Sequence, residues 1–333
     1  MFESQEEKES LLKRGSQTEG LVAQLPERLS VFCLDVSGKT FASGGQDGIV
    51  KLWDEHAECL QRMEAHTETV CCLAFLTPTL LASGSVDKTI RLWHTPTGAP
   101  LATLTAHTSH IYALCPLHRP AEEGIQFASG SHDTTIKIWK IVLSKDQQKV
   151  QSCECLKTLE AHQRGVRCLI QVDDKLVSGG YDKSIKIWDL SSSLCEKEIT
   201  THSDAVICFC VVNFEVVEEE RRVRKKWLCS GGLTLDKSVY VWDCDGWEMR
   251  GCLKGHGDGV LGLVYVGGLN VLVSGSMDNC IKFWDVESGE CKRTIEKAHK
   301  WYIYSLKMLD LGEKQFLLSG SQDCSIKIWD IGV

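Results

Sequence analysis

The sequence predicts an all-β protein built from seven repeated units, and three observations support this prediction. A phrase that begins with Ser-Gly and ends with Trp recurs seven times, and an Asp precedes the Trp by six residues in every copy. Successive Trp residues of the phrase lie 40 to 54 residues apart. Between the phrases, short runs of β-branched and apolar residues alternate with Gly, Asp, Pro and Ser clusters, as strands alternate with turns. Each unit is therefore expected to form four strands.

The repeated phrase keeps its register along the chain. Its copies are SGGQDGIVKLW (43–53), SGSVDKTIRLW (83–93), SGSHDTTIKIW (129–139), SGGYDKSIKIW (178–188), SGGLTLDKSVYVW (230–242), SGSMDNCIKFW (274–284) and SGSQDCSIKIW (319–329). A His lies upstream of six copies, at His66, His107, His162, His202, His256 and His299; the first unit has Glu27 or Arg28 near that place. One four-stranded sheet cannot bury both of its faces, so the units are expected to pack side by side in a ring.

Composition excludes several classes of protein. The formal net charge of −8 argues against a general nucleic-acid binder, since such proteins neutralise phosphates with Lys and Arg. The 17 cysteines lack metal-ligand spacing with nearby His, so we expect no metal site and no cofactor. No apolar run reaches 18 residues, and MFESQEEKES has no basic-then-apolar signal region, so we expect no membrane association. A reducing compartment, the cytoplasm or the nucleus, fits these cysteines.

The residue after the Trp points to a known family. Asp follows Trp in five units, at Trp53, Trp188, Trp242, Trp284 and Trp329, whereas His94 and Lys140 follow it in the second and third units. With this spacing the chain resembles the WD-repeat β-propellers over about residues 18 to 333. The resemblance implies a seven-bladed β-propeller of four-stranded antiparallel blades. We expect residues 1–17 to form a flexible N-terminal tail and residues 18–333 to form the propeller.

In that family a His, a Ser, an Asp and a Trp form a polar tetrad inside each blade. The resemblance assigns His66, Ser83, Asp87 and Trp93 to blade 2, and His162, Ser178, Asp182 and Trp188 to blade 4. Trp has only a donor and an ionised Asp only acceptors, so His and Ser can link them. The same residue types occur in hydrolase triads, but a nucleophile would not be repeated around a ring. We therefore expect a structural role, no catalytic residue and no enzymatic activity.

Ring closure should involve the start of the chain. The sequence stops four residues after Trp329, and the last unit has no fourth strand after its phrase. The resemblance implies that residues 18–26 supply this outer strand and close the ring. The alternative, an open seventh blade, would leave an unpaired sheet edge.

The resemblance also implies a partner-binding surface on the top face, which the loops between blades and the turns inside the repeated phrase form. Three positions per blade are expected to surround the channel mouth there. We expect ten of them to bind partners and call them the top-face set: Phe32, His110, Tyr112, His132, Arg167, Tyr181, Leu235, Met277, Tyr302 and Tyr304. Aromatic residues and Arg are enriched at the centres of protein interfaces.

Three insertions, at 116–124, 141–152 and 214–227, are expected on the opposite, bottom face. The last changes charge sign, and its cations form a second candidate site, the basic hairpin: Arg221, Arg222, Arg224, Lys225 and Lys226. Such a cluster is usually solvated, but it could contact an acidic partner or RNA.

The function predicted from these features is that of a non-catalytic scaffold or adaptor, a monomer within a larger complex, that binds peptide segments or partner subunits on its top face. Two alternatives remain open. A substrate receptor of a ubiquitin ligase often carries Trp-Asp-x-Arg, with Arg three residues after the Trp, and that position holds His56, Ser191, Asp245, Glu287 and Gly332 here. An F-box is also not expected within residues 1–17. A role in RNA processing would depend on the basic hairpin.

Overall fold

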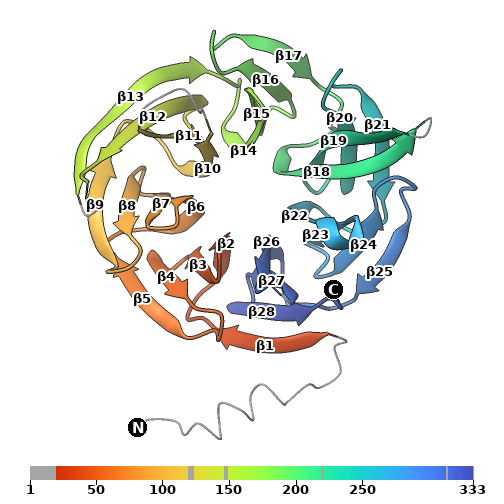
Figure 1. The fold of residues 1–333 in the computed structure, drawn as a ribbon, viewed down its shortest axis with the longest axis horizontal. Coiled ribbons are helices and arrows are strands. Elements are labelled where there is room, and N and C mark those ends of the chain that lie inside the picture. The colour runs from red at the N-terminus through yellow and green to blue at the C-terminus, as the bar shows by residue number, and fades with distance from the viewer. Residues whose placement is uncertain (1–19, 119–123, 146–148, 219–220, 313, 333) are drawn as a thin grey trace, which may run out of the picture.

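The computed structural model describes residues 20–118, 124–145, 149–218, 221–312 and 314–332, and it describes no side chains for residues 216–223. Within these ranges the strands form seven four-stranded antiparallel sheets that surround one axis (Figure 1). The predicted seven-bladed propeller is confirmed. The predicted N-terminal tail, residues 1–17, lies outside the described residues.

Each blade runs from the axis outward in chain order. Blade 1 contains β2 (Val31–Ser37), β3 (Thr40–Gly45), β4 (Ile49–Trp53) and β5 (Cys59–Glu64). Blade 2 contains β6 (Val70–Thr77), β7 (Leu80–Ser85), β8 (Ile90–His94) and β9 (Ala99–Leu104). Blade 3 contains β10 (Ile111–Leu117), β11 (Ile125–Ser131), β12 (Thr135–Leu143) and β13 (Val150–Glu160). Blades 4 and 5 contain β14 (Val166–Val172), β15 (Lys175–Gly180), β16 (Ile185–Asp189) and β17 (Cys195–Ile199); and β18 (Val206–Glu218), β19 (Arg221–Gly232), β20 (Ser238–Asp243) and β21 (Met249–Lys254). Blade 6 contains β22 (Val260–Val266), β23 (Val271–Ser276), β24 (Ile281–Asp285) and β25 (Cys291–Ile295), with the 3-10 turn η1 (Gly267–Leu269) between its first two strands.

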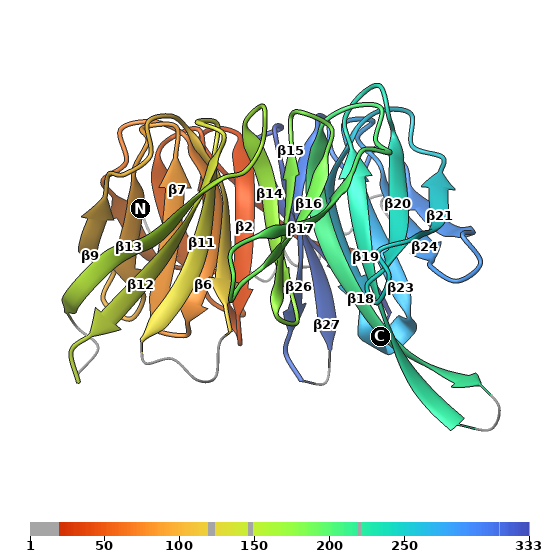
Figure 2. The same ribbon diagram turned by 90° about the horizontal axis from the view of Figure 1, so that it is seen from above.

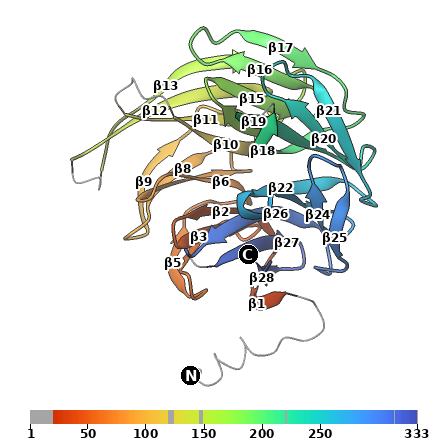
Figure 3. The ribbon, with the colours of Figure 1, turned by 45° about the vertical axis from the view of Figure 1, so that its right-hand side comes forward.

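Blade 7 draws its strands from both ends of the chain. It combines β26 (Ile303–Asp310), β27 (Gln315–Ser321) and β28 (Ser325–Asp330) with β1 (Leu21–Pro26), which lies beside β28 on the outer edge (Figure 3). In the register Leu21 lies opposite Trp329, and the Asp330 N–H donates to the carbonyl of Gly20 at 2.7 Å. Gly20 has φ +85°, and a Cβ there would lie 2.5 Å from the Asp330 carbonyl oxygen, so glycine is required. The predicted closure is confirmed, with a strand that begins at Leu21; residues 18 and 19 lie outside the described residues.

The hydrophobic core lies between blades. Trp188 of blade 4, for example, belongs to one buried cluster with Ala128, Ile136 and Ile138 of blade 3. Each blade therefore buries its apolar face only against a neighbour, and stability is shared around the ring.

Recurrent cysteines connect the innermost strands. The thiols of Cys33, Cys72, Cys168 and Cys208 each lie 3.6 Å from a carbonyl oxygen at the start of the next blade's inner strand. Burial raises the pKa of Cys208 to about 12 and that of the other three thiols well above its usual value. The neutral S–H groups can therefore act as weak donors between blades.

Two of the expected insertions are continued strands. In blade 5, β18 and β19 pair as far as Glu218 and Arg221 and extend beyond the other strands on one face of the ring (Figure 2). In blade 3, β12 and β13 likewise pair as far as Leu143 and Val150. Residues 119–123, inside the third insertion, lie outside the described residues.

Candidate functional site

Six blades contain the same hydrogen-bonded chain. His Nε2 lies 2.6–2.7 Å from the Ser hydroxyl, His Nδ1 lies 2.6–2.9 Å from the Asp carboxylate, and the Trp indole N–H donates to the Ser oxygen at 2.7–2.9 Å. The residues assigned to blades 2 and 4 lie together in this way. Ser83 and Ser178 are fully buried, so their hydroxyls connect side chains in the interior and do not face a substrate.

Burial and hydrogen bonding set the protonation of these chains. Burial lowers the pKa of His66, His107 and His299, although the neighbouring Asp opposes this effect. Burial would raise the pKa of Asp133, but donors from Thr135, Thr108 and His107 hold it at about 2. At neutral pH these three imidazoles are therefore neutral, and the Nδ1–H of each donates to an ionised carboxylate, that of Asp87, Asp133 or Asp323.

Acid should destabilise the protein in two steps. A lowered histidine pKa means that the unfolded chain takes up protons first, so stability is full above about pH 6.5 and decreases as the pH falls below that value. The carboxylates with lowered pKa remove further stability as the pH falls from about 4 towards 2. The urea midpoint of unfolding, measured from pH 8 to pH 3, is expected to fall in this pattern. A midpoint that is constant down to pH 4 would contradict neutral buried histidines.

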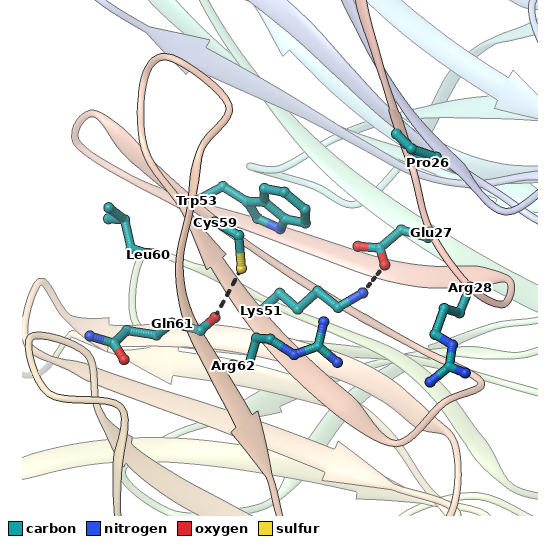
Figure 4. A pocket seen from close by; sticks show the side chains of 9 residues that line it. All are labelled: Pro26, Glu27, Arg28, Lys51, Trp53, Cys59, Leu60, Gln61 and Arg62. Carbon is teal, nitrogen blue, oxygen red and sulfur yellow. Dashed lines mark hydrogen bonds and ion pairs between the residues drawn. The ribbon is translucent and has the colours of Figure 1, made fainter. Parts of the chain in front are cut away.

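Blade 1 uses an ion pair in place of the histidine. Glu27, one of the two residues that the sequence left open, lies 3.4 Å from the Ser43 hydroxyl and forms an ion pair with Lys51 (Figure 4). The Trp53 indole N–H still donates to Ser43 at 2.9 Å. Both charged side chains are at most 7% exposed. Arg28 instead lines an open cleft of about 480 Å³ beside β5, with Leu60 and Arg62.

A β-bulge begins every inner strand and turns one residue out of the sheet register. The seven register shifts fall at equivalent positions and skip Phe32, Cys71, Tyr112, Arg167, Ile207, Leu261 and Tyr304. Bulges re-aim side chains. Four members of the top-face set are such bulge residues, which explains why they can face the axis.

The top-face set forms two aromatic groups. On blades 3 and 4 the rings of His110, Tyr112, His132 and Tyr181 lie 5.9–6.1 Å apart, and the Arg167 guanidinium lies 5.3 Å from the Tyr112 ring centroid. On blades 7 and 1, Tyr304 stacks on Phe32 at 4.5 Å and meets Tyr302 edge-on at 6.4 Å.

An apolar group on blades 5 and 6 connects the two. Ala205, Ile207 and Leu261 are buried together, and Tyr181, Met277, Tyr302 and Tyr304 pack against them. Nine members of the top-face set therefore lie in connected contacts. The tenth, Leu235, is 75% exposed in the turn between β19 and β20.

Sequence reasoning missed Trp301. This side chain is 58% exposed in the loop before β26, next to Tyr302 of the top-face set. The available signal was a Trp outside the repeated phrase, two residues after the tetrad His299.

The basic hairpin is partly neutralised. Arg224 pairs with Glu215 on the facing strand at 3.2 Å, and Lys226 pairs with Asp173 of blade 4. The side chains of Arg221 and Arg222 lie outside the described part of the structure. These pairs reduce the positive charge that the hairpin can offer to an anionic partner.

The described residues contain neither a metal-ligand cluster nor a membrane-spanning helix. No group of three or more His, Cys, Asp or Glu side chains in the described ranges is arranged to hold a metal ion. No helix in those ranges is long and apolar enough to cross a membrane.

Seven repeated blades with exposed loop surfaces define a protein of the repeat-propeller class. The model of the WD domain, G-beta repeat, matches residues 21–54, 57–94, 98–140, 153–189, 247–285 and 289–330, more than half of the chain. The chain therefore belongs to the WD40 family. Blade 5, whose long hairpin and two extra residues before Asp236 depart from the repeat, lies largely outside these matches.

Similar proteins include nuclear distribution protein PAC1 of Gibberella zeae, 30% identical over 296 residues, and that of Arthroderma otae, 27% identical over 293 residues. Both alignments cover 80% of this chain and 61% of the relative. The ribosome biogenesis protein WDR12 homolog of Nematostella vectensis is 25% identical over 281 residues, which is 74% of this chain and 63% of that protein. The chain thus spans about three fifths of the length of these relatives.

Proposed function

We propose that this protein is a non-catalytic scaffold that binds segments of partner proteins on the top face of its propeller, within a multiprotein complex in the cytoplasm or nucleus. The observation that carries the proposal is the contact network of the top-face set, which joins blades 1, 3, 4, 5, 6 and 7 around the axis. Relatives named for nuclear distribution and ribosome biogenesis support an intracellular role in such complexes.

The chemistry of the network suits a peptide. Rigid rings such as Tyr302 and Tyr304 offer large contact areas and lose little entropy on binding. Exposed Trp301 and Leu235 extend this surface outward. Exposed apolar side chains on loops above a rigid scaffold are typical of interaction sites.

Truncation of the network should weaken partner binding without unfolding the ring. Tyr304→Ala and Arg167→Ala are each expected to weaken the main partner at least about tenfold, which corresponds to about 1.4 kcal/mol. The measurement is quantitative affinity capture of tagged whole protein with mass spectrometry, followed by titration of the partner that responds. Thermal unfolding should show that each variant remains folded.

The chain offers a matched control on opposite faces. Leu235 lies in a top-face turn and is 75% exposed, whereas Leu194 lies in the bottom-face turn between β16 and β17 and is 66% exposed. Leu235→Ala should reduce partner binding and Leu194→Ala should not. If the partner is lost with Leu194→Ala, or on neutralising Arg224, Lys225 and Lys226, and survives the top-face changes, the bottom face carries the function.

A further inference from the structure

One bulge residue is charged, and no carboxylate in the described part of the chain forms an ion pair with it. Of the seven bulge side chains, six are neutral and the seventh is Arg167. Its guanidinium lies over the Tyr112 ring at 5.3 Å. Arg167 is half-buried. A charge that is partly removed from water without a counterion is destabilised, so the side chain is poised to accept an anion.

A second cation of the inner strands shows the contrast. Lys307, on β26, lies 2.8 Å from Asp35 of blade 1 and is therefore neutralised within the protein. Arg167 lies near the axis, because it is the bulge residue of the inner strand β14 and its guanidinium reaches the Tyr112 ring of neighbouring blade 3. The unpaired charge is thus central in the top-face set.

The described groups around Arg167 include neutral phenols and apolar side chains. A guanidinium has five N–H donors and no acceptor. Burial raises the pKa of Tyr112 and Tyr304, so these phenols stay protonated at neutral pH and can donate. The buried Ile207 and Leu261, with Met277 beside them, form the apolar group of the same surface.

We propose that Arg167 binds the carboxylate of an Asp or Glu side chain in the partner segment, while neighbouring apolar residues of that segment pack on Ile207, Leu261 and Met277. This proposal rests on the proposed function and specifies the partner's chemistry. One planar guanidinium matches one carboxylate in a bidentate pair. A phosphate with nearly two negative charges is usually bound by a cluster of Arg side chains, so a carboxylate is the better match.

The test begins with a displayed library of random eight-residue peptides selected on the whole protein. Enriched peptides should share one Asp or Glu close to an apolar residue. The best peptide is then synthesised with its acidic residue, with the corresponding amide, and with phosphoserine at that position, and each Kd is measured by fluorescence polarisation. The amide form should bind wild type at least about tenfold more weakly, which corresponds to about 1.4 kcal/mol. On Arg167→Gln, the two forms should differ by less than about twofold, since the pair is already broken.

Controls separate this proposal from the function on which it rests. Arg62→Gln makes the same charge change on an exposed residue of outer strand β5 and should leave all affinities unchanged. If the enriched peptides lack an acidic residue and their binding is lost on Tyr304→Ala, the proposed pairing of Arg167 with a carboxylate is wrong, whereas binding on the top face still holds. The pairing with a carboxylate would also be wrong if the phosphoserine peptide bound more strongly than the acidic peptide. Peptides indifferent to both Arg167→Gln and Tyr304→Ala, or no enrichment, would overturn both proposals.

Discussion

Trp188→Ala is expected to lower the free energy of unfolding by about 3 to 5 kcal/mol, the usual range for removing a buried Trp. Trp188 is 6% exposed, lies in one buried cluster with Ala128, Ile136 and Ile138 of blade 3, and donates its indole N–H to Ser178 at 2.9 Å. The substitution leaves a cavity between two blades and removes a donor from a buried hydroxyl. Urea unfolding measures the effect, followed by far-UV circular dichroism because the substitution itself changes tryptophan fluorescence.

Asp182→Ala should also destabilise the protein, because Asp182 lies at the other end of the hydrogen-bonded chain that includes Trp188. The carboxylate accepts from His162 at 2.9 Å and from the backbone N–H of Gln163 at 2.8 Å. Each buried group left without its partner costs about 1 to 3 kcal/mol. Asp182→Asn keeps the shape of the side chain and removes its charge. The decrease in the free energy of unfolding that it causes therefore shows how much stability depends on ionisation of Asp182.

Exposed Trp301 supplies the control for Trp188. Trp301→Ala removes the same side chain from the surface and should change stability by less than about 0.5 kcal/mol. If Asp182→Ala left the melting temperature unchanged and abolished an activity, the chain His162, Ser178, Asp182 would be a catalytic site, and the structural role assigned to it would be wrong.

The repeat made the ring predictable, because a fixed register forces equivalent residues into equivalent places. The Asp that precedes each Trp by six residues, together with the resemblance to the WD-repeat family, therefore located the tetrads of blades 2 and 4. Blade 1 shows the limit of this reasoning. The sequence narrowed the missing histidine to Glu27 or Arg28, but only packing could decide, since Glu27 is held by Lys51, a residue 24 positions away.

Other features depend on contacts that a single strand does not reveal. The segment around 214–227 has an insertion's charge pattern, yet it continues the ladder, and Glu215 and Arg224 lie opposite each other in the register and pair. The contact network of the top-face set depends on a bulge in each inner strand, and bulges leave no distinct sequence signal here. That Arg167 forms no ion pair with a described carboxylate could be recognised only from the positions of the neighbouring side chains.

Deleting residues 1–26 is expected to destabilise the whole ring or cause aggregation, whereas deleting residues 1–15 should be tolerated. The longer deletion removes β1 and leaves β28 with an unpaired edge, a template for pairing with other chains. It also removes the partly buried Val22, Ala23 and Leu25 from the cluster that joins blades 7 and 1. Melting temperature and the fraction of monomer after gel filtration measure both effects.

Moving the strand rather than deleting it makes the test sharper. Because β1 is antiparallel to β28 and Gly20 accepts a hydrogen bond from Asp330, a short turn can join residue 332 to residue 20. A chain that starts at Glu27 and carries residues 20–26 behind residue 332 should therefore regain monomeric behaviour and most of its stability. An Ala23→Pro version of the moved strand, with one backbone N–H removed at a paired position, should rescue less. If the 1–26 deletion is as stable as the 1–15 deletion, or if the moved strand restores nothing, pairing of β1 with β28 does not close the ring.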